Sequence, residues 1–527
     1  MKLGWVLVLA VLTGFLSLSQ EILWANVLSN ADQGRPDVFA HMLGVFLIGI
    51  ALGALFGRKI QQVMQWHTLT FVGVMLVVIG CLFFVAFPVG ARVLTLSKGW
   101  GLLILHLFVL LSAFFMGGVF PALCDCGIAP EKGVGRSVSW VYLANIVGAT
   151  AGPLVTGFWL LDVDSVANNI LIVSVMTLLL GEVVLLFAPL VVWQKRIGIG
   201  CVGAVVVLVM YAQPYLYDDF WERVHFNTEY QDFMPNTYLF LEETRSGVVG
   251  VWPPNGLYGG GVYDGRFSLD PLRNTNLITR AYFVPALHPN PKRIYMVGMG
   301  SGSWARVLAD YPEVEKLVVV EIGPAYLSVM KQFPNIGSVL DDPRVEVYID
   351  DGRRWLNQHP NEKFDAIVMN VAWHWRGHAT HVLSEEFLKI CKQHLNPNGF
   401  VYYNATGSED VLYTAAHVFD YVTQYINFVA ASDHPFDMTD ERQRLNLMKF
   451  KHEGEFVFVG ENTQVLEELL AVDTSNMKPF LLKQKGLWRI TDDNMATEFK
   501  TNGAGAWWRS LWSRIYIPER SWHALLF

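Results

Sequence analysis

Three short apolar segments between residues 293 and 349 have the pattern of buried strands, and each ends in residues that could contact a polar ligand. The first is followed by spaced glycines, the second ends in an acid, and the third is followed by two acids and a glycine. These positions are Gly298, Gly300, Ser301 and Gly302, then Glu321, and then Asp350, Asp351 and Gly352. Because the carboxyl ends of parallel strands meet at one edge of a sheet, we expect the three groups to lie together.

The residue types at these strand ends predict a nucleoside site. Spaced glycines let the chain turn sharply and approach a ligand without a Cβ clash, and the helix that follows offers free N–H groups. Glu321 lies 19 residues beyond Gly302, a spacing that suits an acid accepting both ribose hydroxyls. A carboxylate at Asp350 or Asp351 can accept a hydrogen bond from an adenine amino group.

The loop after a fourth apolar segment carries a different set of side chains. It begins with Asn370, whose amide cannot serve as a general base at neutral pH. It continues with Trp373, His374, Trp375, Arg376, His378 and His381. The three histidines, spaced four and three apart, could share one face of a helix. One of them could act as a base, together they could bind zinc, or they are ordinary polar residues of a loop; we predict no metal site.

Several short motifs resemble the spermidine synthase family. They are residues 288–292 (His-Pro-Asn-Pro-Lys), the Val-Glu pair ending at Glu321, residues 341–345 (Asp-Asp-Pro-Arg-Val), Asp351-Gly352, residues 383–387 and residues 395–399. Tyr263-Asp264-Gly265 is similar to a Leu-Asp-Gly element of the family. The resemblance covers roughly residues 235–460. Residues 140–152 and 491–494 resemble segments of bacterial proteins that fuse such a domain to several membrane helices.

The resemblance implies a transferase that uses S-adenosylmethionine or its decarboxylated form. The family reaction moves an aminopropyl group to putrescine, and methyl transfer is the alternative for this type of cofactor. By this resemblance the cofactor contacts are Gly298, Gly300, Ser301, Gly302, Glu321, Asp350, Asp351 and Gly352. The catalytic candidates are Asn370, His374, His378 and His381, and the candidate substrate contacts are Tyr263, Asp264, Trp373 and Arg376.

Two positions depart from the family pattern. Ser301 stands where soluble spermidine synthases carry an Asp in the glycine turn, so one reason for selecting a decarboxylated cofactor is lost. Asn370 replaces the acid that would take the proton of the acceptor amine. The acceptor is therefore expected to be an amine or an amphiphilic molecule rather than putrescine specifically. The alternative is a membrane protein that uses a degenerate domain of this type to sense or bind a ligand without catalysis.

Composition divides the chain into two halves. The 527 residues are 52% hydrophobic and 16% charged, against about 25% charged in a typical soluble protein. The apolar excess lies in residues 1–213, which we predict to form a bundle of about seven transmembrane helices, each near the roughly 20 residues that cross a bilayer. The predicted spans are residues 4–28, 38–57, 68–90, 100–123, 137–161, 167–192 and 196–213. Small residues that allow close helix packing recur at Gly44, Gly49, Gly53 and Gly57.

The distribution of Lys and Arg bears on the orientation in the membrane. With seven spans, the positive-inside rule puts the amino terminus in the cytoplasm and the C-terminal half outside. A reaction on a cytosolic metabolite requires the opposite, and the first segment, interrupted by Gln20 and Glu21, is the span whose removal from the count would reconcile the two. We expect a multi-pass protein of a bacterial inner membrane with a cytoplasmic C-terminal domain, although the charge count argues against that side.

Residues 214–527 regain charge and alternate between strand-like and helix-like patterns. We predict a linker and small β subdomain at 214–285, with turns at residues 253–256 and 264–265. An α/β Rossmann-like domain of the methyltransferase and spermidine synthase type is expected at 286–470. The tail at 471–527 is rich in Trp and Arg and could lie on the membrane surface or pack on the domain.

Charge and cysteine content exclude some classes of protein. A net charge of −8 and a pI near 6.0 argue against a nucleic-acid-binding surface. Five cysteines, four of them in the apolar half, imply no disulfide framework. The expected partners are a nucleoside cofactor and the lipid bilayer, and the chain could form a homo-oligomer. Transport is the weakest hypothesis, because the predicted spans carry few charges for ion coupling.

Overall fold

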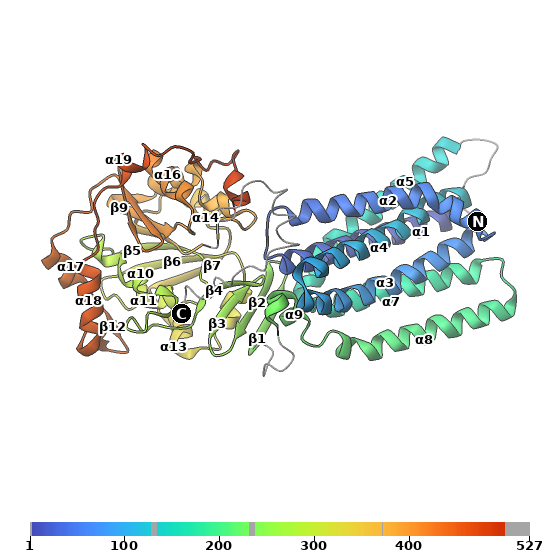
Figure 1. Ribbon diagram of the computed structural model, residues 1–527, viewed down its shortest axis with the longest axis horizontal. Helices are drawn as coiled ribbons and strands as arrows, with labels where there is room; N and C mark the ends of the chain where they lie inside the picture. Colours follow the sequence, from blue (N-terminus) through green and yellow to red (C-terminus); the bar gives the residue numbers. More distant parts are fainter. Residues whose placement is uncertain (1–2, 128–133, 231–237, 372, 501–527) are drawn as a thin grey trace. The chain divides into compact units, whose positions relative to one another are not determined.

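The computed structural model describes residues 3–127, 134–230, 238–371 and 373–500 (Figure 1). The chain divides into two compact units, one made of Met1–Thr237 with Glu243–Gly247 and the other of Tyr238–Glu242 with Val248–Phe527. The first unit is helical, and the second combines strands and helices. Of the Trp- and Arg-rich tail predicted at 471–527, residues 501–527 lie outside the described part of the chain.

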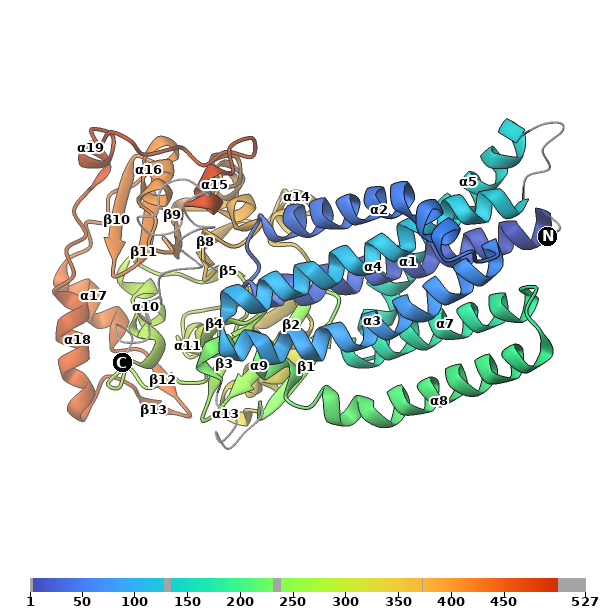
Figure 2. The same cartoon turned by 45° about the vertical axis from the view of Figure 1, so that its right-hand side comes forward.

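Seven long apolar helices run through the first unit (Figures 1 and 2). They are α1 (Leu3–Ala31), α2 (Val38–Val63), α3 (Thr68–Leu96), α4 (Lys98–Gly127), α5 (Val134–Val155) with its continuation to Val163, α7 (Val166–Phe187) and α8 (Val192–Leu216). As candidate spans they are 22 to 29 residues long, enough to cross a bilayer. The predicted count of seven is confirmed among the described residues, and these helices suggest a multi-pass membrane protein.

Glycines set the distance between two of these helices, α2 and α4, which pack along each other. A Cβ built on Gly49 would lie 2.6 Å from the Cβ of Ala113, and one on Gly53 would overlap the carbonyl of Phe114. By contrast, no atom comes within 4 Å of a Cβ built on Gly44. The close contact therefore depends on the later glycines of the predicted series and not on its first member.

A four-stranded sheet opens the second unit. Its strands β1 (Phe240–Thr244), β2 (Gly247–Trp252), β3 (Gly256–Gly259) and β4 (Val262–Arg266) follow one another in chain order. The turn predicted at residues 253–256 is confirmed between β2 and β3. The turn predicted at residues 264–265 is wrong, because Gly265 takes a φ of +132° inside β4, where the pairing with β3 is irregular.

A seven-stranded sheet in the order β10-β11-β9-β8-β5-β6-β7 follows. Its strands are β5 (Arg293–Val297), β6 (Lys316–Glu321), β7 (Val345–Ile349), β8 (Phe364–Met369), β9 (Leu395–Asn404), β10 (Tyr421–Tyr425) and β11 (Phe428–Ser432). Strands β5 to β9 are parallel, and β11 pairs with β9 in the antiparallel sense. The chain order runs outward in both directions from β5 and β8, which makes the gap between them the topological switch point.

Helices cover both faces of this sheet, because successive strand side chains point to opposite sides. In β5, Ile294 and Met296 enter one hydrophobic cluster and Tyr295 and Val297 enter the other. The first cluster includes α11 (Ser303–Ala309), α12 (Ala325–Met330), α17 (Asp440–Leu447) and α18 (Thr463–Leu470). The second includes α14 (Gly352–Gln358), α15 (Glu385–Gln393), α16 (Glu409–Val418) and α19 (Lys478–Leu481), as Figure 2 shows. The predicted Rossmann-like α/β architecture is confirmed.

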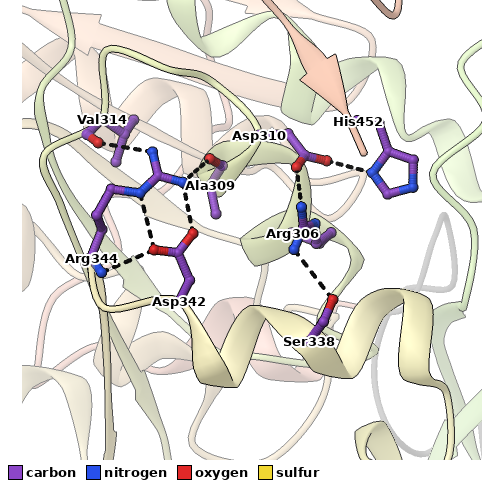
Figure 3. A network of polar contacts seen from close by, with 8 residues as sticks. All are labelled: Arg306, Ala309, Asp310, Val314, Ser338, Asp342, Arg344 and His452. Carbon is purple, nitrogen blue, oxygen red and sulfur yellow. Dashed lines mark hydrogen bonds and ion pairs between the residues drawn. The ribbon is translucent and has the colours of Figure 1, made fainter. Parts of the chain in front are cut away.

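The Asp-Pro-Arg motif before β7 ties neighbouring elements of the sheet together (Figure 3). Arg344 donates from Nε and Nη2 to the two carboxylate oxygens of Asp342, at 3.0 and 2.7 Å. The same guanidinium donates to the carbonyls of Ala309, at 2.6 Å, and Val314, at 3.1 Å. The motif therefore fixes the start of β7 against the end of α11 and the segment before β6.

Candidate functional site

The glycine and acid positions predicted from the sequence do meet at one end of the parallel sheet. The N–H of Gly298 donates to the carbonyl of Val320 at 2.9 Å, and that of Asp350 donates to the carbonyl of Glu321 at 3.1 Å. A Cβ built on Gly298 would lie 3.6 Å from the carbonyl oxygen of Asn370, at the tip of β8. The tips of β5, β6, β7 and β8 are thus neighbours around the switch point.

The three glycines after β5 have different roles. All have positive φ angles, +84° at Gly298, +52° at Gly300 and +77° at Gly302, which L-residues rarely adopt. A Cβ on Gly302 would overlap the sulfur of Met330, so this glycine serves the packing of α11 on α12. The nearest atom to a Cβ on Gly300 is 3.7 Å away, so Gly298 and Gly300 are the glycines that leave room beside the turn.

Ser301 faces the small sheet. Its hydroxyl donates to Ser303 Oγ at 3.0 Å, and the Ser303 hydroxyl donates to the carbonyl of Arg266 at 3.0 Å. The serine that replaces the family's acid is buried in this chain of hydrogen bonds between the glycine turn and the end of β4.

Glu321 is held by the backbone of the turn. Its Oε2 accepts from the N–H of Met299 at 2.6 Å, and its Oε1 accepts from the N–H of Gly323 at 2.8 Å. Only 4% of the residue is exposed, and burial raises the pKa of its carboxyl, whereas hydrogen bonds from Gly323, Met299 and Gly300 act in the lowering direction. With three backbone donors the carboxylate still keeps acceptor capacity that a ligand hydroxyl could use.

Asp350 and Asp351 have local partners at the start of α14. Asp351 caps the helix, because its Oδ1 accepts from the N–H of Arg354 at 2.7 Å. Asp350 Oδ1 accepts from Nε of the same arginine at 2.6 Å. A Cβ on Gly352 would lie 2.9 Å from Val297 Cγ1, so this glycine allows α14 to approach β5. Neither acid loses all its acceptor capacity through these contacts.

Asp264 is the centre of a polar cluster whose third member, Tyr326, was not predicted from the sequence. Its carboxylate accepts a hydrogen bond from the hydroxyl of Tyr326 on α12 and lies 3.5 Å from Nη1 of Arg376, in the loop after β8. Arg376 also donates to the carbonyl of Gly259 at 3.3 Å, and a Cβ on Gly259 would overlap the Tyr326 hydroxyl. Burial raises the pKa of Asp264, while Arg376 and Tyr326 act in the lowering direction.

Two of the four predicted substrate contacts, Asp264 and Arg376, are therefore brought together. Tyr263 lies apart from them: its ring is 5.8 Å from that of Tyr258, and burial raises the pKa of Tyr263 to about 12. Neighbouring residues of a strand point to opposite faces, which separates Tyr263 from Asp264. Trp373 stacks near Trp375 with ring centroids 6.3 Å apart.

The three histidines of the loop do not share a helical face, contrary to the spacing argument. Only Ala379–Val382 form a short 3₁₀ turn, which His378 precedes with a φ of +68°. His378 and His381 are exposed, with ring centroids 5.5 Å apart. His374 is buried, its Nδ1 lies 3.0 Å from both Thr406 O and Thr406 Oγ1, and its Nε2 lies 2.8 Å from the carbonyl of Lys500. Both nitrogens of His374 thus have protein partners.

The segment from Trp488 to Lys500 holds this loop in place. Glu498, which is buried, accepts from the N–H of Thr380 at 3.0 Å and from its hydroxyl at 2.6 Å. Asp410 on α16 accepts from Thr497 at 2.7 Å and from Lys500 at 2.5 Å. These contacts join residues more than 80 positions apart. The only feature of the sequence that pointed to a role for this segment was the motif at residues 491–494.

Comparison with known proteins agrees with this geometry. Residues 280–439 match the family model described as the Spermine/spermidine synthase domain. The match to this model lies in the C-terminal part of the chain. A polyamine aminopropyltransferase of Thermoanaerobacter sp. (strain X514) is 36% identical over 115 residues, and one of Streptococcus pneumoniae serotype 4 is 35% identical over 119 residues. In both cases the match covers 22% of this chain and 41% of the relative, so the chain spans less than half the length of these relatives.

Among solved structures, the spermidine synthase from Thermotoga maritima resembles part of this chain. It is 20% identical, with a TM-score of 0.36, and the alignment covers 48% of this chain and 88% of that one. A human methyltransferase-like protein 13 in complex with SAH is 21% identical, with a TM-score of 0.28, and the alignment covers 37% of this chain and 91% of that one.

Proposed function

We propose that the chain is a membrane-anchored transferase that moves an aminopropyl or methyl group from an adenosyl sulfonium compound to an amine or amphiphilic acceptor. The observation that carries this proposal is the meeting of Gly298, Glu321 and Asp350 around the switch point of a spermidine synthase domain. Ligands of open parallel sheets bind at this place, outside the carboxyl ends of the strands.

The residues present suit an adenosyl ligand. Gly298 and Gly300 would let it approach the backbone of the turn, because no atom lies within 3.5 Å of a Cβ built on either. Glu321 would accept from the ribose hydroxyls through its remaining lone pairs, and Asp351 from the adenine amino group. S-adenosylmethionine or its decarboxylated form supplies a carbon activated by a sulfonium when bound. The domain's own part is to orient that carbon and to exclude water.

The choice between the two cofactors rests on the glycine turn. Ser301 gives no negative charge to attract the amino group of a decarboxylated cofactor, and its hydroxyl is already bonded to Ser303. Arg376, by contrast, brings a positive charge to the same end of the sheet. S-adenosylmethionine is therefore proposed as a ligand on equal terms with the decarboxylated form, and methyl transfer on equal terms with aminopropyl transfer.

Calorimetry on the full chain in detergent tests the proposal. Both cofactors are titrated into the wild type, Glu321→Gln and the control Glu346→Gln, which changes a β7 residue outside the candidate site. Glutamine at 321 replaces one acceptor oxygen with a donor that faces a backbone N–H, so binding is expected to weaken at least tenfold. The control should bind as the wild type does. Absence of heat with either cofactor in the wild type would remove the proposal.

A second candidate function is ligand sensing without catalysis. It is favoured because two of the catalytic candidates have no free basic atom. Asn370 has only an amide, and both nitrogens of His374 contact Thr406 and Lys500. Incubation of the wild type with radiolabelled S-adenosylmethionine and a cell extract separates the two. Binding without any labelled product would favour the sensor, and a labelled product would exclude it.

The membrane location and orientation belong to the same proposal. We place the spermidine synthase domain in the cytoplasm of a bacterium, where its metabolites are found, with the seven apolar helices as the anchor. Seven spans and the positive-inside rule together favour the opposite side. Two fusions after residue 527 decide between the two orientations, one with a reporter active only in the cytoplasm and one with a reporter active only in the periplasm. An active cytoplasmic reporter places the domain inside. An inactive cytoplasmic reporter together with an active periplasmic reporter places it outside.

A further inference from the structure

Asp264 lies where four segments of the spermidine synthase domain meet. It belongs to β4, its carboxylate accepts from Tyr326 on α12, and it pairs with Arg376 of the loop after β8. Its main-chain oxygen is the nearest atom, at 3.7 Å, to a Cβ built on Gly300 of the glycine turn. The side chain is 14% exposed, so the carboxylate is largely removed from water while remaining beside the proposed cofactor turn.

Transfer of an alkyl group to an amine requires a proton acceptor at this place. The amine must lose a proton to attack, or its product must lose one afterwards. Asn370, at the position where a basic side chain is expected, has only an amide. His374 is engaged at both nitrogens, and His378 and His381 are exposed at the surface of the loop. None of the four catalytic candidates is therefore a buried group with a free basic atom at this place.

The charges around Asp264 fit a cationic acceptor. The titratable and charged groups that face it are Tyr326 from α12, Glu321 from the tip of β6 and Arg376 from the loop after β8. Of these two neighbouring carboxylates, Asp264 pairs with the Arg376 guanidinium, so the local charge would favour an additional cation. Burial raises the pKa of both carboxyls, and the Asp264 carboxylate further raises the pKa of Glu321.

We propose that Asp264 is the proton acceptor of the transfer reaction and binds the ammonium form of an amine acceptor in exchange for Arg376. This inference rests on the proposed function. Asp264 first takes a proton from the bound ammonium, which frees the nitrogen lone pair. That lone pair forms the new N–C bond, the C–S bond breaks with its electrons going to sulfur, and the sulfonium becomes a neutral thioether. The product nitrogen leaves as a secondary ammonium and the proton on Asp264 passes to solvent, so charge and atoms balance.

Tyr326 and Arg376 are positioning residues in this scheme. The Tyr326 hydroxyl fixes one oxygen of Asp264, and Gly259 makes that contact sterically accessible. Arg376 at 3.5 Å holds a looser contact than a two-pronged pair of guanidinium and carboxylate, so an incoming ammonium can replace it. Together they keep the carboxylate aimed at the end of the sheet when no acceptor is bound.

The test compares Asp264→Asn with the control Asp270→Asn in the full chain in detergent. Asp270 is an exposed acid of the segment that follows β4 and lies outside the site. Calorimetry measures the two cofactors alone, and then putrescine, spermidine and octylamine in the presence of 5′-methylthioadenosine or S-adenosylhomocysteine. Asp264→Asn should retain cofactor affinity within about threefold and weaken amine binding at least tenfold at pH 7, whereas Asp270→Asn should change neither. Amine binding unaffected by Asp264→Asn, or absent in the wild type with all three probes, would overturn the inference.

The dependence of the transfer rate on pH supplies the second measurement. Loss of a general base typically slows a reaction by about 10²–10⁴-fold. Asp264→Asn should show such a loss at pH 7 and recover to within about tenfold of the wild type near pH 10, where an alkylamine with a pKa of about 10.4 has a substantial neutral fraction. A loss that is the same at both pH values would indicate a purely structural role and would overturn the inference.

Tyr326→Phe keeps the inference testable if Asp264→Asn does not fold. Removing the donor should raise the pKa of Asp264 and move the acidic limb of the pH–rate profile to higher pH, and an unmoved limb would contradict the inference. Failure of the proposed function is recognised separately, because a wild type that binds neither cofactor removes both ideas. A wild type that binds and reacts while Asp264→Asn does so equally well removes only this one.

Discussion

Arg353 and Asp492 form a two-pronged ion pair across 139 positions of the chain, with Nη1–Oδ1 at 2.7 Å and Nη2–Oδ2 at 2.6 Å. Arg353 lies in α14, directly after the acids of the candidate site, and Asp492 lies in the late segment that crosses the loop after β8. Asp492 also accepts from Ser384, the N-cap of α15, at 2.8 Å. One carboxylate thus joins the starts of two helices that flank the site.

Replacing Arg353 by Lys should lower the stability of the domain, because a lysine cannot reproduce the two parallel hydrogen bonds. Asp492 exposes 36% of its side chain, so solvent screening keeps the expected loss near about 1 kcal/mol, equivalent to a melting temperature lower by about 2–4 °C. Thermal unfolding of the full chain in detergent measures it. The ion pair of Glu385 with Lys389, whose side chain is 57% exposed, provides the control: Lys389→Ala should cost less than about 0.5 kcal/mol, and equal effects of both variants would contradict the prediction.

Substitutions at Gly302 and Gly300 of the turn should affect different properties, the first mainly the stability of the domain and the second mainly cofactor binding. Alanine at 302 would overlap Met330 at a φ of +77°, so Gly302→Ala is expected to destabilise the domain by about 2–4 kcal/mol. Gly300→Ala has open space and bears only the strain of a left-handed conformation, about 1–2 kcal/mol, yet its methyl group would face the proposed ligand. Melting temperature and cofactor calorimetry together test the pair. If Gly302→Ala folds and loses more cofactor affinity than Gly300→Ala, the assignment of Gly302 to packing and of Gly300 to binding would be refuted.

The Asp342–Arg344 pair should stabilise the fold in a pH-dependent way. Hydrogen bonds from Arg344 hold the pKa of Asp342 below its ordinary value. For an acid whose pKa is depressed in the folded state, the stabilisation is complete above the unfolded pKa of about 3.9 and is lost as the pH falls through the folded pKa. The difference in melting temperature between the wild type and Asp342→Asn should therefore be constant from pH 7 to pH 5 and shrink below about pH 4.

Asp341→Asn is the matched control for this pH dependence, because Asp341 precedes Asp342 in the same motif but is exposed. Its melting temperature should follow that of the wild type at every pH. A difference for Asp342→Asn that widens on acidification would mean that the pair does not stabilise the folded state through the ionised carboxylate.

The strand ends of the candidate site could be predicted from the sequence because they are local features. An apolar strand followed by Gly298, or ending in Glu321, is visible in one short window, and the parallel topology then brings the ends together. The partners of these residues are not local. Tyr326 meets Asp264 only because α12 and β4 fold against each other, and Lys500 reaches His374 from 126 positions away. The hydrophobic periodicity of the sequence does not predict such long-range contacts.

Conformations set by tertiary context were missed for the same reason. The histidine spacing suggested a helical face, but the loop from Asn370 is fixed by Thr380 bonding to Glu498 rather than by helical hydrogen bonds. Asp264-Gly265 has the composition of a turn, but Gly265 serves an irregular strand because the hairpin turns earlier, at Gly260 and Gly261. Local propensity is a weak guide wherever a distant segment supplies the hydrogen bonds.

The helical unit offers a prediction with an internal control, because two glycines of α2 have opposite surroundings. A methyl group at Gly53 would overlap the carbonyl of Phe114, so Gly53→Ala must push α2 away from α4, at a cost of about 1–3 kcal/mol. Gly44→Ala meets no atom within 4 Å, and alanine favours helix over glycine, so its effect should be neutral or slightly stabilising. Melting temperatures in one detergent compare the two variants. Equal effects of the two variants would show that the close approach of α2 and α4 at Gly53 does not govern the stability of the bundle.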